Sequence, residues 1–329
     1  MAHITHDILA THAKEKVNLP SDKAKQHRGQ VNHLRTRLEA HIAAHPDYDL
    51  VKLRGSGSTA KHTAIRGGGS DADVAAYVRA SAVGGLAAPE AGLLEWLKER
   101  CQEVYGATKV ADDFYVSDHA VAITLHGTGL KIDVAPVLYE GLPNDQGHLV
   151  TRQGTRVLTS VTQHLAFINS RASIAGSGYK ELIRLLKAWI RHSKFEDDDF
   201  RCKSFLIELI VAHLWDVGWN GEKLAVNDYP RAFEQVLAYM AVTGLKTPIV
   251  FSDHYAADAA PGSFDPIQVW DPVNPTNNVA SSYTDTDRKR LVERAAVSLD
   301  AIVWAAQAPT KSIANECWRT LLGPTFGGA

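Results

Sequence analysis

The period of the hydrophobic positions changes about halfway along the chain. Between residues 50 and 138, short apolar runs alternate with amphipathic segments. This pattern predicts strands ending at Arg54 and covering 72–79, 114–125 and 130–138, with helices near 59–64 and 90–104. From residue 157 a helical period dominates, interrupted by strand-like pieces at 248–251 and 267–270. It predicts helices over 159–173, 177–193, 202–217, 228–242, 285–307 and 309–321.

The first 44 residues contain two further helical patterns, over 4–17 and 22–44, broken at Asn18-Leu19-Pro20. Ser21 and Asp22 are expected to cap the second helix. Together these elements predict an α+β fold: a lobe with a mixed sheet packs on a mostly helical C-terminal lobe, with the active site in the cleft between them. We place the two domains at residues 1–150 and 151–329.

The residues most typical of a catalytic site lie at the end of the first predicted strand and the start of the second. A Gly-Ser turn at Gly55-Ser56 is followed by two aspartates one residue apart, Asp71 and Asp73. Side chains alternate along a strand, so these two carboxylates point to the same face. They repel each other unless a cation lies between them, and Mg²⁺ prefers oxygen ligands of this kind. The glycines at 67–69 are expected to form a turn, and the Gly-Ser turn offers backbone N–H groups to an anion.

The segment also fits other interpretations. An Asp-x-Asp pair is also common on surface strands, where it does no chemistry. A Walker A loop would require Gly-Lys-Ser/Thr, whereas Lys61 lies between Ala60 and His62. The Ser-x-x-Lys pattern of serine β-lactamases occurs at Ser58–Lys61, but the chain contains no Lys-Thr-Gly.

A third carboxylate follows in the segment Leu130-Lys131-Ile132-Asp133-Val134. An aspartate in an otherwise apolar strand is costly unless it is paired or binds a metal ion. Asp133 is therefore the best candidate to complete a two-metal site with Asp71 and Asp73.

These segments together resemble the DNA polymerase β-type nucleotidyltransferases. The resemblance rests on Gly55-Ser56, Ser70-Asp71-Ala72-Asp73 and Lys131-Ile132-Asp133-Val134. Within that group the chain is most similar to the oligoadenylate synthetase and cyclic GMP–AMP synthase branch, which includes the bacterial CD-NTases of CBASS anti-phage defence. Three later segments agree: Leu185–Trp189, Lys203–Leu209, and Val269–Val279 with its Asp-Pro-x-x-Pro-like pattern.

The resemblance implies a role for each candidate residue. Asp71, Asp73 and Asp133 would hold two Mg²⁺ ions, with Mn²⁺ as an alternative, and Asp133 would also act as general base. Gly55 and Ser56 would cradle the phosphates. Three further residues would bind the nucleotide: Lys187 and Ser204 at the triphosphate, and Phe205 by stacking on the base. Two structural alternatives stay open, because Lys187 belongs to a basic stripe with Lys180, Arg184, Arg191 and Lys194, and Phe205 could be a core residue.

Composition narrows the class of protein. The 329 residues carry 35 Lys and Arg against 37 Asp and Glu, a net charge of −2, which disfavours a protein that depends on nonspecific DNA binding. Cys101, Cys202 and Cys317 have no zinc or redox spacing, and the seven histidines before residue 46 are interpreted as surface residues. No run of apolar residues reaches membrane-spanning length and no signal peptide is evident, so a cytoplasmic enzyme that needs no membrane is expected.

Three functions compete. The favoured one is an enzyme that joins ATP, alone or with other nucleoside triphosphates, into a cyclic oligonucleotide second messenger for CBASS signalling and releases pyrophosphate. The resemblance further implies a protein regulator and a separate effector, without an obligatory nucleic acid. A linear oligoadenylate synthase or RNA terminal transferase is the alternative, and a non-catalytic nucleotide sensor is the third. Base identity, ring size and linkage stay open.

Overall fold

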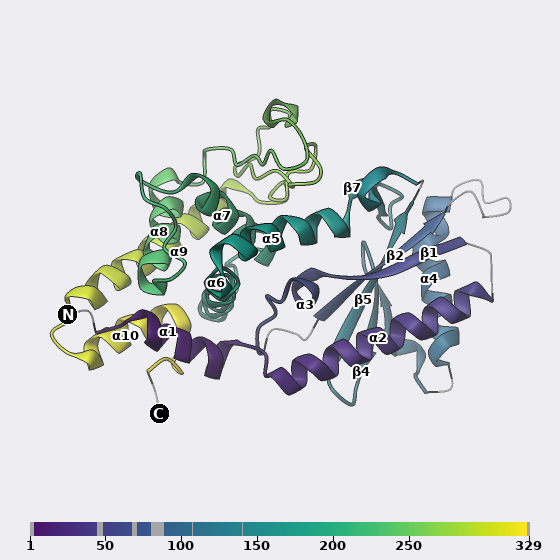
Figure 1. Ribbon diagram of the computed structural model, residues 1–329, viewed down its shortest axis with the longest axis horizontal. Helices are drawn as coiled ribbons and strands as arrows, with labels where there is room; N and C mark the ends of the chain where they lie inside the picture. The colour runs from purple at the N-terminus through teal and green to yellow at the C-terminus, as the bar shows by residue number, and fades with distance from the viewer. Residues whose placement is uncertain are drawn as a thin grey trace. The chain divides into compact units, whose positions relative to one another are not determined.

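The computed structural model describes residues 3–44, 49–67, 71–79, 89–106, 108–139 and 141–327. Contacts divide the chain into two compact units. We call residues 19–166 the sheet unit, and residues 1–18 with 167–329 the helical unit (Figure 1). This division differs from the one expected from sequence at both ends, because the first 18 residues join the helical unit and the later boundary falls at 166. The turn expected at Gly68 and Gly69 and the loop before Pro89 lie outside the described residues.

In the described part of the chain, seven strands form one mixed sheet in the sheet unit. The central order is β1-β2-β5-β4-β3, in which β2 and β5 are parallel and the other neighbours antiparallel; β6 pairs with the end of β5, and β7 with β6. The strands are β1 Asp49–Ser56, β2 Asp71–Arg79, β3 Phe114–Val116, β4 Val121–Leu125, β5 Leu130–Leu138, β6 Gly147–Val150 and β7 Arg156–Thr159. A mixed sheet with many helices confirms the α+β fold class.

Two helices cover one face of this sheet, α2 over Ser21–Ala43 and α4 over Pro89–Tyr105 (Figure 1). The apolar stripe of α2 and every second residue of β2 belong to the same buried cluster. Its members there are Val31, Leu34, Leu38 and Ile42 from α2, and Ala72, Val74, Ala76 and Val78 from β2. Because strand residues alternate, the other face of β2 carries Asp71, Asp73, Ala75 and Tyr77. The apolar packing on one face therefore fixes the aspartates on the opposite one.

The helical unit contains α1 His6–His12, continued by a π-helical turn over Ala13–Val17, and the helices α6 Ser177–Glu196, α7 Ser204–Val217, α8 Tyr229–Thr243, α9 Asp285–Gln307 and α10 Lys311–Leu322. Helix α5, Val161–Ala175, begins at the end of the sheet unit and continues into the helical unit. Short helical segments cover Gly57–Lys61 (α3), Ala111–Asp113, Pro143–Asp145 and Ala257–Ala259.

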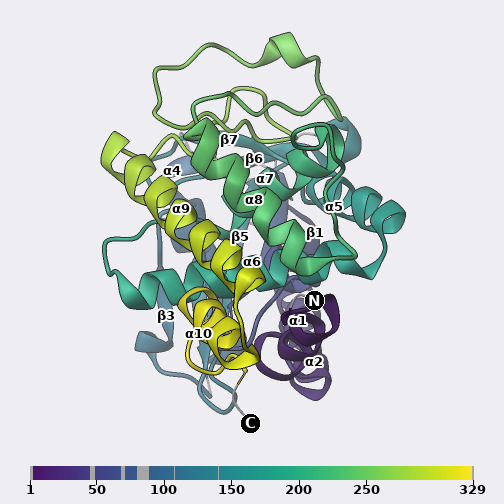
Figure 2. The ribbon, with the colours of Figure 1, turned by 90° about the vertical axis from the view of Figure 1, so that its left-hand side faces the viewer.

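The first 18 residues belong to the helical unit because their apolar and aromatic side chains pack there. Leu9 and Val17 are buried, and the ring of His6 lies 4.2 Å from that of Tyr229. His12 is buried with its ring 5.0 Å from that of Phe326, and both views place α1 beside α10 (Figure 2). The interpretation of the early histidines as surface residues is therefore wrong for His12, as it is for the buried His27 on α2.

Three local expectations need correction. The N-cap of α2 is Pro20, whose carbonyl accepts the amide of Ala24 at 2.8 Å, so Ser21 is already helical and no side chain caps this end. Strands β6 and β7 were not expected, because four-residue segments with mixed polarity give almost no periodic signal. The strand-like pieces at 248–251 and 267–270 form a single parallel bridge between Ile249 and Val269.

Candidate active site

The ladder of the sheet brings the predicted acidic residues together. Ser56 on β1 lies opposite Asp73 on β2, and Asp73 lies opposite Asp133 on β5. Neighbouring strands are about 4.8 Å apart, so Asp73 and Asp133 are adjacent. Asp71 lies two residues before Asp73 and therefore on the same face. Three carboxylates thus share one small area of the sheet.

A glycine that sequence reasoning gave no role brings the backbone against this area. Gly57, the first residue of α3, has φ +63°, and a Cβ atom built on it would lie 1.6 Å from Oδ2 of Asp73. Only glycine fits both the backbone angle and the close approach. The sequence signal was the second glycine in Gly55-Ser56-Gly57.

Burial and mutual repulsion make this cluster costly in its ionised form. The pKa of Asp73 is raised to about 6, first by burial and then by the charges of Asp133 and Asp71, while Lys61 and Lys131 oppose the shift. The pKa of Asp71 is also raised, mainly by burial. Asp71 lies opposite Lys131 in the parallel ladder, and Nζ of Lys131 is 3.3 Å from Oδ1 of Asp133. The two lysines are part of the site's charge balance, and neither was predicted.

The donor set fits a divalent cation, although the described residues contain no cluster of three ligands already converged on one point. Oδ1 of Asp133 is buried and accepts no hydrogen bond from the described residues, although the ammonium of Lys131 lies 3.3 Å away as an ion-pair partner. Lys131 alone does not neutralise three neighbouring carboxylates, so a cation is favoured beside them. The raised pKa values of Asp71 and Asp73 give the same indication, because a cation would offset the burial and the mutual repulsion that raise them. Oxygen ligands alone favour Mg²⁺ or Mn²⁺.

A cavity of about 170 Å³ adjoins the Gly-Ser turn. The predicted residues Gly55 and Ser56 line it together with Asp73. Its opposite wall comes from α2 and includes Arg28, Asn32 and Arg35. Val31 and Ala72 also line it, so this cavity lies on the face of the sheet that α2 covers, opposite the face that carries the acidic side chains.

The other predicted nucleotide-binding residues, Lys187, Ser204 and Phe205, lie in the helical unit. Ser204 is exposed at the first position of α7, and Phe205 beside it is half-buried. Lys187 on α6 is buried, and its Nζ lies 2.5 Å from Oε1 of the equally buried Glu208 on α7. Lys187 is thus part of an interhelical ion pair, and the basic stripe on α6 is not a solvated face, since of its members only Lys194 is exposed.

The polar residues of the segment Val269–Val279 form hydrogen bonds with the backbone of the same segment. Oδ1 of Asp271 accepts the amide of Val273 at 2.8 Å, and Oδ1 of Asn278 accepts the amide of Val269 at 3.0 Å. Asn274 accepts the amide of Thr276 in the same way. These buried side chains replace backbone partners in an irregular loop, so the motif shapes the loop.

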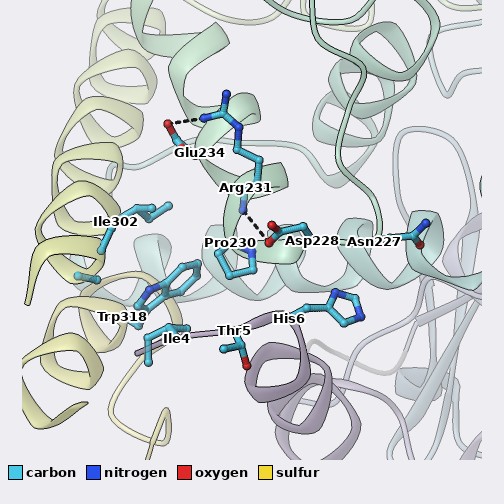
Figure 3. A pocket seen from close by; sticks show the side chains of 12 residues that line it. Ile4, Thr5, His6, Asn227, Asp228, Pro230, Arg231, Glu234, Ile302 and Trp318 are labelled. Carbon is cyan, nitrogen blue, oxygen red and sulfur yellow. Dashed lines mark hydrogen bonds and ion pairs between the residues drawn. The ribbon is translucent and has the colours of Figure 1, made fainter. Parts of the chain in front are cut away.

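A second cavity of about 430 Å³ lies within the helical unit (Figure 3). Its walls include Ile4, Trp318, Asp228 and Arg231. The charged groups there already have partners: Asp228 caps α8 by accepting the amide of Arg231, whose guanidinium pairs with Glu234 at 2.7 Å (Figure 3). This cavity contains none of the residues expected to bind a nucleotide.

Comparison with known proteins identifies the family. No protein-family model matches the sequence. The chain is 38% identical over 329 residues to the cyclic AMP-AMP-AMP synthase of Escherichia coli strain MS 115-1, covering 99% of both chains. Structures of E. coli MS115-1 CdnC, one with ATP and one in a complex with HORMA, superpose with a TM-score of 0.87 over 99% of this chain and at least 99% of theirs. Vibrio cholerae DncV, a cyclic AMP-GMP synthase, shares the fold with a TM-score of 0.71 at 12% identity, covering 98% of this chain and 97% of its own.

The chain therefore belongs to the CBASS oligonucleotide cyclases, the CdnC-like bacterial nucleotidyltransferases. The resemblance drawn from Asp71, Asp73 and Asp133 is confirmed at the level of the family. The protein is a nucleotidyltransferase that joins nucleoside triphosphates into a cyclic oligonucleotide second messenger for anti-phage signalling. Within the described ranges, no helix has the length and apolar character that crossing a membrane requires.

Proposed function

We propose that the enzyme binds two Mg²⁺ ions through Asp71, Asp73 and Asp133 and uses ATP to make a cyclic oligoadenylate. The observation that carries this proposal is the ladder register that sets Asp73 beside Asp133, with Asp71 on the same face. The 38% identical relative is a cyclic AMP-AMP-AMP synthase, so a ring of three adenylates is the first product to seek.

In the proposed reaction, a ribose hydroxyl oxygen of one nucleotide attacks the α-phosphorus of another. A new phosphodiester bond forms, and the bond to pyrophosphate breaks. The bound metal ions would supply charge neutralisation at the phosphates and lower the pKa of the attacking hydroxyl. Asp133 receives the hydroxyl proton, while Asp71 and Asp73 hold the charge in place. A final intramolecular attack of the same kind closes the ring.

Five further residues would bind the nucleotide. Gly55 and Ser56 are proposed to contact the phosphates, since Ser56 lies opposite Asp73 in the strand ladder and Gly55 directly precedes it. Ser204 is proposed to hydrogen-bond the triphosphate and Phe205 to stack on a base, because Ser204 is exposed and Phe205 only half-buried. For Lys187, contact with the triphosphate would occur alongside its ion pair with Glu208, which holds its ammonium in place.

We further propose regulation by a protein partner and signalling through a separate effector in the cytoplasm. The relative CdnC forms a complex with HORMA, which makes a HORMA-like protein the first partner to test. Long nucleic acid is not expected to be obligatory, given the net charge of −2. Titrating double-stranded DNA and RNA against product yield at two salt concentrations tests this, and a salt-sensitive stimulation from near zero would contradict it.

The metal site is tested by pyrophosphate release from ATP. Asp71→Asn and Asp133→Asn are expected to lower the rate at least about 100-fold, because each removes a charge that holds the reacting phosphates. Asp118→Asn is the matched control, since Asp118 is exposed in the same unit and outside the acidic cluster. Near-normal release by Asp133→Asn would overturn the assignment of the catalytic base.

A further inference from the structure

Lys131 shares the face of the sheet that carries the three proposed metal ligands. It lies on β5, two residues before Asp133, and alternation therefore puts both side chains on the same face. In the parallel ladder it lies opposite Asp71 on β2. Its neighbours Leu130 and Ile132 belong to the cluster buried under α2. The packing of β5 thus fixes the ammonium group on the side of the carboxylates.

The ammonium of Lys131 holds the carboxylate of Asp133 only weakly. Nζ lies 3.3 Å from Oδ1 and donates to Oδ2 at 3.4 Å. Strong charge-assisted hydrogen bonds are shorter, about 2.7–2.9 Å. The side chain of Lys131 is 44% exposed, so its ammonium can leave Asp133 for water at little cost. Lys61, the other lysine of the site, is buried and has no such direct access to water.

A metal ion and the Lys131 ammonium compete for Asp133. Both positive charges would contact the same carboxylate, and like charges so close together repel each other. Among the described residues, Asp133 is the one side chain to which Lys131 is joined by a hydrogen bond or ion pair. The three carboxylates outnumber the two lysines, so the metal-free site is only partly neutralised. Lys131 therefore lowers the repulsion among the carboxylates while no metal ion is bound, and it weakens their attraction for one that arrives.

We propose that Lys131 is an exchangeable counter-ion, which pairs with Asp133 in the metal-free enzyme and keeps the affinity for a divalent cation low until a nucleotide binds. The phosphates of the nucleotide bring the negative charge that offsets the repulsion between ammonium and cation. Lys131 thus couples occupation of the metal site to binding of the triphosphate. It is a positioning residue, because it acts through Asp133. This inference rests on the metal site proposed above and goes beyond it in naming what sets the affinity of that site.

The first test is Mn²⁺ binding to the nucleotide-free protein, with free Mn²⁺ measured by electron paramagnetic resonance at fixed ionic strength. Lys131→Gln is expected to bind Mn²⁺ about five- to tenfold more tightly than wild type, because it removes the competing charge. Lys131→Arg keeps the charge and should stay within about twofold of wild type. Lys25→Gln removes an equal charge from an exposed position on α2, which covers the opposite face of the sheet, and should also stay within about twofold. Unchanged or weaker binding by Lys131→Gln would overturn the inference, as would an equal tightening in Lys25→Gln.

The coupling to substrate is tested with the Mn²⁺ complex of a non-hydrolysable ATP analogue, measured by calorimetry. Lys131→Gln should bind this complex no more tightly than wild type, because the complex carries a net negative charge that the lysine attracts. A tightening as large as that for free Mn²⁺ would contradict the coupling.

The metal site and the role of Lys131 fail in different ways. If neither wild type nor Lys131→Gln bound Mn²⁺, the metal site of the proposed function would fail together with this inference. Equal Mn²⁺ binding by both proteins, with loss of binding in Asp133→Asn, would overturn the role of Lys131 and leave the metal site standing.

Discussion

Replacing Asp73 by asparagine should stabilise the protein while abolishing its activity. The pKa of Asp73 rises from 3.8 to about 6 in the folded state. Each pKa unit corresponds to about 1.4 kcal/mol, so keeping the carboxylate ionised at neutral pH costs about 3 kcal/mol of folding free energy. The folded state binds the proton more tightly than the unfolded one, so wild type regains this energy as the pH falls from about 6 toward 3.8. Asp73→Asn is therefore more stable than wild type by the full amount above pH 6, and the difference in stability disappears near pH 4.

The assay is chemical denaturation of wild type and Asp73→Asn in EDTA at pH 7.5 and pH 4.5, with Asp118→Asn as control. We expect the free energy of unfolding to rise by about 2 kcal/mol in Asp73→Asn at pH 7.5 and to differ little at pH 4.5. Mg²⁺ should raise the stability of wild type but not of the variant. A variant less stable than wild type at pH 7.5 would refute the picture of three repelling carboxylates.

Substitutions at Gly57, Lys187 and His12, with their controls, test particular contacts. Gly57→Ala should lower the rate of pyrophosphate release at least about 100-fold, because its Cβ would meet the carboxylate of Asp73. It should also destabilise the protein in denaturation experiments, whereas Gly55→Ala should leave the free energy of unfolding unchanged, because there is open space around its Cβ. In denaturation experiments Lys187→Ala should cost about 3–5 kcal/mol by leaving Glu208 buried and unpaired, and Lys187→Met with Glu208→Leu should restore most of it; a stable single variant would contradict the ion pair. Burial lowers the pKa of His12 from 6.5 to about 4, so stability should fall as pH drops through that window. His12→Gln should remove about 2 kcal/mol of that loss, measured as the difference between the free energies of unfolding of wild type and variant as a function of pH.

The acidic site was predictable because its signal is local. Asp71 and Asp73 share a strand face by alternation, and Asp133 stands out as the one acidic residue in its strand. Their adjacency required the parallel pairing of β2 with β5, which only the family resemblance supplied before the structure. The long helices were predictable for the same reason, since their apolar period extends over several turns.

The features that could not be predicted from the sequence depend on contacts between residues that are distant along the chain. The burial of His12 follows from packing on Phe326, more than 300 residues away, and Arg35 on α2 donates a hydrogen bond to a carbonyl oxygen on β1. Lys187 matched a basic surface stripe, yet its partner Glu208 lies one helix later. Periodicity identifies a face but not the residue that will meet it. Pairings of this kind emerge only from the assembled fold.

The most direct test of the central claim is identification of the product. Purified protein is incubated with all four nucleoside triphosphates and Mg²⁺, alone and with a HORMA-like partner, and the products are resolved by mass spectrometry before and after phosphatase treatment. The account predicts a phosphatase-resistant cyclic oligoadenylate and pyrophosphate from wild type, with neither from Asp133→Asn. A linear, phosphatase-sensitive oligonucleotide, or the same product from both proteins, would contradict it.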